Sequence, residues 1–323
     1  MIDRRGLLVA GTAGLSLAAL GGPARAQAPG TLNLFIPAAP GGGWDGTGRA
    51  IERAMRAAGI VQNFQFDHAP GAGGAVGLPR FLQQRRGQGD TLMVAGMVMV
   101  GSLITNRSPV RLLDTTPVAR LTGEALAVVV PAASPFQTMR QLADAFRTDP
   151  GRVSWAGGSA GGSDHILAGL IAKSVGLDAR RVSYVAFAGG GPAQAALLGN
   201  QVSCGISGYS EFAEQIKAGR LRALALSSAE RVPGIDVPTL RESGIDVELV
   251  NWRGLFGAPG ITPAQRETLV GLVRRMVESD PWKAELQRND WLSMPIYGDD
   301  YTRYVQAEFA RIEGILRDIG LAT

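Results

Sequence analysis

The chain contains a glycine-rich segment, Pro40 to Arg49, between a strand-like run at 31–37 and a helix-like run at 50–58. Glycine lets the backbone approach a ligand closely, and the N–H groups that open a helix lack internal partners and lie at the positive end of its dipole. Segments of the same kind occur at 70–74, 157–163 and 189–192. Four such junctions in one chain predict several loops that converge on one small anionic ligand.

Strand-like runs alternate with helix-like runs through almost the whole chain, which favours α/β layers over an antiparallel barrel. Several of the strand-like runs are continuously apolar, as is typical of parallel strands that are buried on both faces. The predicted strands are 32–36, 62–66, 91–94, 118–121, 125–130, 153–155, 182–187, 202–206, 223–226 and 247–250.

Helix starts are marked by capping residues. Ser163 is predicted to cap a helix over 164–175, and Thr262 opens a capping box with Gln265 and with proline at the first helical position. A final helix is predicted over 300–318, because its apolar residues recur at helical spacing.

Residues 1–26 are predicted to be a secretory signal peptide. Arg4 and Arg5 form a basic start, an apolar run follows at 6–20, and Ala24-Arg25-Ala26 fits a cleavage site. The paired arginines leave both the Sec and the twin-arginine route open. We therefore expect an exported, periplasmic protein.

Charge and composition exclude several classes of function. Without residues 1–26 the chain has 29 basic and 27 acidic residues, and these are scattered, so nucleic-acid binding is not expected. Cys204 is the only cysteine and there are two histidines, so neither an internal disulfide nor a usual zinc site is predicted. Cys204 is interpreted as a small buried residue. No cofactor is expected, since no P-loop occurs and Val76 interrupts a dinucleotide-like glycine pattern.

Ser159 lies in a G-x-S-x-G sequence between a strand and a helix, which resembles the nucleophile elbow of an α/β hydrolase. That reaction needs a histidine base downstream. His165 lies inside the helix that the elbow would start, and His68 lies upstream. The favoured interpretation is that the chain is not an enzyme and that Ser159 and Ser163 donate hydrogen bonds to a ligand; an exported serine hydrolase remains the alternative.

Two side chains of the first junction have open roles. Asp45 either caps the helix that contains Arg49 or contacts the ligand, and Arg49 either pairs with Asp45 or reaches the anion. Trp44 is interpreted as a wall or lid of the binding pocket.

Taken together, these segments resemble the substrate-binding proteins of the tripartite tricarboxylate transporter family, the Bug-type periplasmic receptors. Pro40-Gly41-Gly42 with Asp45 and Arg49 is similar to the family's P-G-G-x-x-D-x-x-x-R signature. The segments at 70–74, 155–165 and 187–192 resemble its second, third and fourth loops, and 216–225 with 237–244 resembles its return segment. His68 stands where many relatives carry asparagine.

The resemblance implies a two-lobed, type II-like α/β binding protein, in which two crossing strands join the lobes and a ligand cleft lies between them. The expected lobes are 31–130 with 227–323, and 131–226. The residues expected to bind the ligand are Gly42, Gly43, Trp44, Asp45, Gly71, Ala72, Gly73, Ser159, Ala160, Gly161, Ser163, Gly189, Gly190 and Ser207.

The resemblance also implies a function. The expected ligand is a small carboxylate, either a di- or tricarboxylate such as citrate or an aromatic acid, and the expected partners are membrane permease subunits of a tripartite tricarboxylate transporter. The receptor is expected to be a monomer that neither binds nucleic acid nor needs a cofactor or metal. A ligand sensor that feeds a two-component kinase remains an alternative role, and the identity of the carboxylate is open.

Overall fold

The computed structural model describes residues 29–322, so the predicted signal peptide lies outside the described residues. The strands are β1 (Thr31–Ile36), β2 (Asn63–His68), β3 (Thr91–Gly96), β4 (Thr116–Pro131), β5 (Ser154–Gly157), β6 (Ser183–Ala186), β7 (Cys204–Gly208), β8 (Leu221–Leu226), β9 (Val250–Gly257) and β10 (Leu292–Tyr297). The helices are α1 (Gly43–Ala57), α2 (Gly77–Gln84), α3 (Met97–Thr105), α4 (Met139–Thr148), α5 (Ser163–Ser174), α6 (Gly190–Leu198), α7 (Tyr209–Lys217), α8 (Pro263–Glu278), α9 (Asp280–Arg288) and α10 (Gly298–Asp318).

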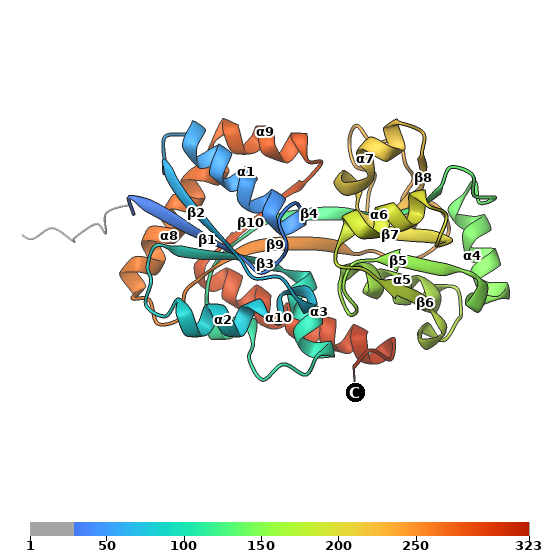
Figure 1. The fold of residues 1–323 in the computed structure, drawn as a ribbon, viewed down its shortest axis with the longest axis horizontal. Helices are drawn as coiled ribbons and strands as arrows, with labels where there is room; N and C mark the ends of the chain where they lie inside the picture. The colour runs from blue at the N-terminus through green and yellow to red at the C-terminus, as the bar shows by residue number, and fades with distance from the viewer. Residues whose placement is uncertain (1–28, 323) are drawn as a thin grey trace, which may run out of the picture.

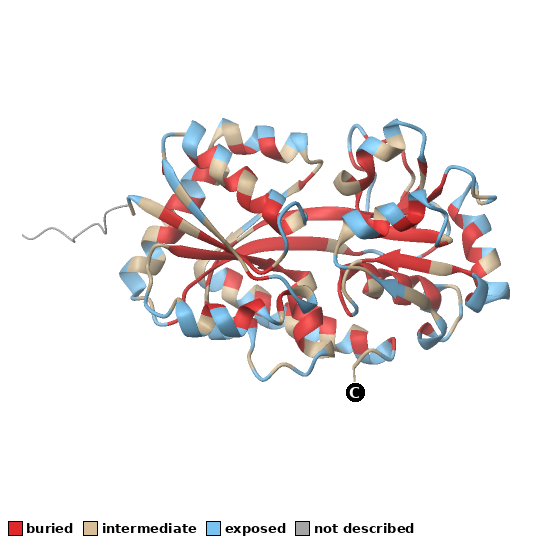
Figure 2. Cartoon of the chain, viewed as in Figure 1, coloured by how far each residue is buried: buried red, intermediate tan, exposed pale blue. Residues whose placement is uncertain are grey.

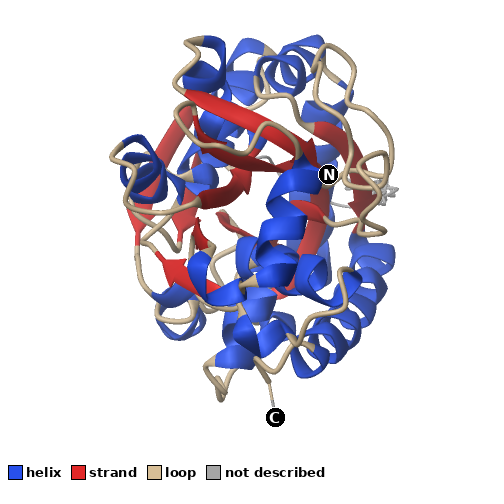
Figure 3. Cartoon of the chain, turned by 90° about the vertical axis from the view of Figure 1, so that its right-hand side faces the viewer, coloured by secondary structure: helices blue, strands red, loops and turns tan. Residues whose placement is uncertain are grey.

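The strands form two α/β lobes along an elongated molecule (Figure 1). In the first lobe β1 pairs in parallel with β2 and β3, β9 runs antiparallel between β3 and β4, and β10 pairs with β4. In the second lobe β5 pairs in parallel with β6 and β7, and both β7 and β8 pair antiparallel with β4. Helices flank the strands when the molecule is viewed from its end (Figure 3). The predicted fold class is therefore confirmed.

Strand β4 belongs to both lobes. Its residue Ala125 pairs with Val250 of β9, whereas Leu126, the next residue, pairs with Gly208 of β7. From Leu121 to Pro131 the strand is buried without interruption, because it lies in the middle of both lobes (Figure 2). The runs predicted at 118–121 and 125–130 are thus one long crossing strand.

The second crossing between the lobes is the return of the chain toward β9. Residues 223–226 lie in β8, which pairs with β4 inside the second lobe, and the chain returns to the first lobe through β9. Residues Val232, Ile235 and Val237 of the connecting segment pack with the second lobe's apolar cluster around Phe212. The predicted lobe boundaries at 130 and 226 stay predictions.

The helices bury the faces that the sequence predicts. The capping box of Thr262 and Gln265 is present at the start of α8. Behind it Leu269, Val273 and Met276 of α8 are buried. Cys204 on β7 is also buried, as a free thiol. Among residues 29–322, no helix is both long enough and apolar enough to cross a membrane.

Candidate ligand cleft

The four glycine-rich junctions line one cavity of about 500 Å³. Two of them follow β1 and β2 of the first lobe, and the other two follow β5 and β6 of the second lobe. All four lie at the carboxyl ends of parallel strands, which is where open α/β sheets bind their ligands. Helices α1, α5, α6 and α7 begin at this cavity, so their unpaired N–H groups and positive dipole ends meet there.

Most of the residues expected to bind the ligand surround this cavity. Those that line it are Gly42, Gly43, Trp44, Gly71, Ala72, Gly73, Ser159, Ser163, Gly189, Gly190 and Ser207. Asp45, Ala160 and Gly161 do not line it. Ala160 is exposed, and Gly161 packs against Thr105 of α3.

Asp45 shapes the first loop from within α1. The N-cap of α1 is Gly42, so Asp45 is not the cap but a residue of the first helical turn. Its carboxylate accepts the Gly41 N–H at 2.9 Å, and its Oδ1 lies 2.8 Å from His68 Nε2. Burial raises the pKa of Asp45, but the Gly41 N–H, His68 and Arg49 together hold it below its ordinary value.

Arg49 is not among the residues that line the cavity. Its Nε lies 3.5 Å from Asp45 Oδ1, and its guanidinium stacks over the Phe66 ring at 3.7 Å. Its side chain is 43% exposed. Of the two roles left open by the sequence, the structure therefore shows the pairing with Asp45.

Trp44 forms part of the cavity wall and is only 8% exposed. Its indole lies against Gly74, where an added Cβ would approach the ring to 3.0 Å. Gly74 also has φ of +90°, a conformation that favours glycine. The first and second loops thus pack on each other through Trp44.

The third loop is fixed by Asp164 and not by a serine cap. The N-cap of α5 is Gly162, and the Ser163 hydroxyl donates to Asp164 Oδ1 at 2.9 Å, which corrects the predicted capping role of Ser163. Asp164 Oδ2 accepts the Gly158 N–H at 2.8 Å. Burial raises the pKa of Asp164 to about 6.

The ring of His165 is held by contacts with Gly161 and Tyr184. Its Nδ1 accepts the Gly161 N–H at 3.3 Å, and its ring stacks on Tyr184 with the ring centroids 4.0 Å apart. Burial lowers the pKa of His165 to about 4. These contacts describe a packed histidine inside α5.

An ion pair that the sequence analysis missed borders the cavity. Arg253 of β9 lines the cavity, and its Nη2 lies 2.5 Å from Glu124 Oε2 of β4. The guanidinium also lies over the Trp291 ring at 5.4 Å. A signal was available, because a charged residue interrupts the apolar run at 252–258, but only the pairing with Glu124 explains its burial.

Glu211 is a second residue that the sequence analysis missed. It lies in the first turn of α7, lines the cavity and accepts the Ser207 hydroxyl at 2.8 Å. Burial, with smaller contributions from Glu124 and Asp164, raises the pKa of Glu211 to about 7, although Arg253 and Ser207 act to lower it.

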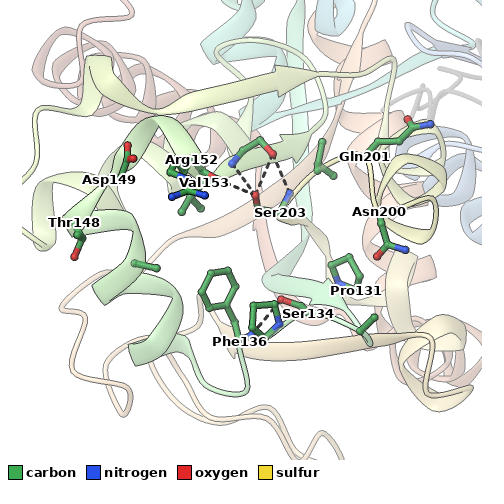
Figure 4. A pocket seen from close by; sticks show the side chains of 15 residues that line it. Pro131, Ser134, Phe136, Thr148, Asp149, Arg152, Val153, Asn200, Gln201 and Ser203 are labelled. Atoms are coloured by element: carbon green, nitrogen blue, oxygen red, sulfur yellow. Dashed lines mark hydrogen bonds between the residues drawn. The ribbon is translucent and has the colours of Figure 1, made fainter.

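A larger hollow of about 700 Å³ lies in the second lobe, away from the glycine-rich junctions, with Pro131, Phe136, Arg152 and Ser203 among its lining residues (Figure 4). It lies beside Thr148, the last residue of α4, and Asn200, just beyond α6. Helix C-terminal ends disfavour anions. The cavity at the junctions is therefore the better candidate for an anionic ligand.

Among residues 29–322, no cluster of three or more histidine, cysteine, aspartate or glutamate side chains could hold a metal ion.

Comparisons with known proteins agree with the expected family. The family model described as the tripartite tricarboxylate transporter family receptor matches residues 49–321. A protein from Pseudomonas sp. (strain P51), described as a UPF0065 protein in the tcbD-tcbE intergenic region, is 32% identical over 276 residues, which cover 81% of this chain and 78% of that protein.

Solved structures share the fold. MatC from Rhodopseudomonas palustris, with bound malate, has a TM-score of 0.78 at 24% identity, and the match covers 88% of this chain and 98% of MatC. Rpa4515 from R. palustris, with adipate, has a TM-score of 0.81 at 21% identity, and the match covers 90% of this chain and 98% of Rpa4515. With a family model that matches most of its length, the chain belongs to the tripartite tricarboxylate transporter receptor family.

Proposed function

We propose that this chain is an extracytoplasmic receptor that captures a small carboxylate and delivers it to the membrane permease subunits of a tripartite tricarboxylate-type transporter. The observation that supports it most is the meeting of four helix N-termini and one buried guanidinium, that of Arg253, around a single cavity. The ligand that we propose is a di- or tricarboxylate such as citrate, or an aromatic acid.

The chemistry of the cavity suits this ligand. Backbone N–H groups at the start of α1 and α5 can donate to carboxylate oxygens without a cation in the loops, and Ser159 adds a hydroxyl. Arg253 supplies the planar donor pair that matches a carboxylate. A cavity of about 500 Å³ is in the size range of small-molecule sites. The structural neighbours that hold malate and adipate support the same ligand class.

Capture without conversion is part of the proposal. The family and fold are those of solute-binding receptors, and the ring of His165 is held against Tyr184. We also propose that residues 1–26 export the chain to the periplasm and that the receptor acts as a monomer.

The test is a ligand screen with the chain from residue 27 onward. Citrate, succinate, malate, adipate and benzoate are added in turn while thermal unfolding is followed, because a ligand at ~100 times its dissociation constant adds about 2.7 kcal/mol of stability. Titration calorimetry then gives the affinity, and NMR of the mixture reports whether the ligand survives. Binding of at least one carboxylate with no product is expected, whereas no binding by any of them, or conversion of a bound one, contradicts the proposal.

A further inference from the structure

Three carboxyl groups surround one guanidinium at the cleft. Asp164 and Glu211 line the cavity with Arg253, and Glu124 lies directly behind Arg253. Arg253 is the one basic residue among the described residues that line this cavity. If all three acids are ionised, a carboxylate ligand enters a site with an excess of negative side-chain charge, which costs binding free energy in a poorly solvated cleft.

Two of the three acids accept hydrogen bonds from the protein on both carboxylate oxygens. Glu124 pairs with Arg253 and accepts both the N–H and the hydroxyl of Ser210. Asp164 accepts the Gly158 N–H on one oxygen and the Ser163 hydroxyl on the other. Each oxygen of these two acids is thus already held by a donor from the protein, so neither acid has an oxygen left for the ligand.

Glu211 is different, because its carboxyl group has a free oxygen that faces the cleft. Oε2 accepts the Ser207 hydroxyl, while no hydrogen bond to Oε1 is formed within residues 29–322. An added Cβ on Gly43 would lie 3.0 Å from Oε1 and 2.8 Å from Arg253 Nη2, so the acid and the cation both border the start of α1. The charged groups that act on Glu211 are Glu124 on β4, Arg253 on β9 and Asp164 on α5; α6 meets it with Gly190.

We propose that Glu211 takes up one proton from solvent when a carboxylate occupies the cleft, so that the receptor captures its ligand together with a proton. This inference rests on the proposed function. A protonated Glu211 can donate a hydrogen bond from Oε1 to the ligand, whereas an ionised Glu211 repels it. Burial already raises the pKa of Glu211 to about 7, so a ligand carboxylate has to raise it only a little further for the proton to stay bound.

The test is titration calorimetry with succinate, in two buffers of different ionisation enthalpy, at a pH slightly above 7. The expected result is a net uptake of up to one proton per ligand, together with an affinity that falls by as much as about tenfold per pH unit above pH ~7. Glu211→Gln keeps the donor and removes the titration, so its affinity is expected to be independent of pH and higher than that of the unmodified protein near pH ~8. Glu214→Gln is the matched control, since Glu214 lies on α7 but is exposed and pairs with Lys217.

Several outcomes separate this inference from its alternatives. If Glu211 stays ionised and accepts a ligand hydroxyl, malate will bind more tightly than succinate, Glu211→Gln will remove that preference, and no proton will be taken up. Proton uptake that persists in Glu211→Gln and disappears in Asp164→Asn would show that Asp164, and not Glu211, takes up the proton. Either result overturns the inference while the receptor function stands; failure of every carboxylate to bind overturns both.

Infrared difference spectra give a second measurement that does not depend on affinity. A carbonyl stretch of a protonated carboxylic acid is expected to grow when succinate is added, and to be missing in Glu211→Gln but present in Glu214→Gln. A spectrum with no such band contradicts proton uptake by a carboxyl group.

Discussion

Arg253 and Glu124 meet at 2.5 Å on neighbouring strands of the crossing region, with their side chains only 4% and 1% exposed. Glu124 also accepts hydrogen bonds from Ser210, which lies at the start of α7 in the second lobe. One carboxylate thus joins β9, β4 and a helix of the other lobe, and it orients the guanidinium that lines the cleft.

Removing the cation is expected to damage both stability and binding. Arg253→Gln leaves Glu124 buried without its partner, which should cost about 3 to 5 kcal/mol in the free energy of unfolding. In the double variant Arg253→Met with Glu124→Leu, most of that stability should return because no buried charge is left unpaired, while ligand affinity should not. Urea unfolding and titration calorimetry measure the two quantities separately; full affinity in the double variant would show that Arg253 does not contact the ligand.

The first loop should tolerate no side chain at its helix start. An added Cβ at Gly43 would lie 2.8 Å from Arg253 Nη2, so Gly43→Val is expected to displace the cleft's charged groups and abolish binding. Gly46→Ala is the control, because nothing lies within 4 Å of that position on the same helix, and it should add up to about 1 kcal/mol of helix stability.

Arg49→Gln should weaken binding only slightly, because Arg49 pairs with Asp45 and stacks on Phe66 outside the cavity. Calorimetric titration of this variant and of Gly43→Val compares the contribution of the Arg49 side chain with that of the backbone at the start of α1. Complete loss of affinity in Arg49→Gln with affinity retained in Gly43→Val would show that a side-chain cation in α1 holds the anion.

Ser159 and Ser163 should differ in their importance for binding. Ser159 lines the cavity, so Ser159→Ala should cost about 1.5 to 3 kcal/mol of binding free energy if its hydroxyl donates to a carboxylate. Ser163 already donates to Asp164, so Ser163→Ala should act more weakly and through the loop. Ser174→Ala, exposed at the end of the same helix, should change nothing. Equal affinity in all three variants would make the third loop merely structural.

The ligand-free protein is expected to lose stability as the pH rises from about 4 to about 7. The pKa of Glu211 is raised from 4.5 to about 7 and that of Asp164 from 3.8 to about 6, whereas that of His165 is lowered from 6.5 to about 4. The two raised acids outweigh the one lowered histidine, so in this range the folded chain binds more protons than the unfolded chain. The free energy of unfolding must then fall with rising pH. Glu211→Gln should flatten this slope and be more stable than the unmodified protein near pH ~8, by on the order of 1 kcal/mol or more, since one pKa unit corresponds to about 1.4 kcal/mol. Denaturant titrations at two pH values measure the free energy of unfolding of both proteins. If its change with pH is the same in Glu211→Gln as in the unmodified protein, the raised pKa of Glu211 is contradicted.

Local sequence signals predicted much of this fold. Apolar runs marked eight of the ten strands within a few residues, and glycines between strand and helix marked the loops that line the cavity. These features succeed because each depends on neighbours in the chain: a strand on its own side chains, a helix start on its cap. Strand β10 was missed because it is a bulged edge strand with alternating, partly polar residues.

The charged part of the site could not be predicted in the same way. Glu124 and Arg253 are 129 positions apart, and each alone looks like a break in an apolar run. The strand predicted at 247–250 lies instead at Val250–Gly257, because Arg253 is made compatible with burial only by its distant partner. The role of Asp45 stays open at the sequence level for a related reason: its contact with His68 is tertiary and invisible to helix patterns.

The glycines of the cleft also limit how its selectivity can change over generations. Gly43 borders Arg253, Gly190 borders Glu211, and Gly208 borders Glu124; at each of them a methyl group would collide with the ionisable side chain opposite. A single replacement in a loop therefore disturbs a charge on another element before it can create a contact with a new substrate. In descendants of this receptor that acquire a different substrate, the ionisable residue should have been replaced by a smaller one before the glycine was replaced by a larger one. Sequences with the reverse order of replacement should be rare.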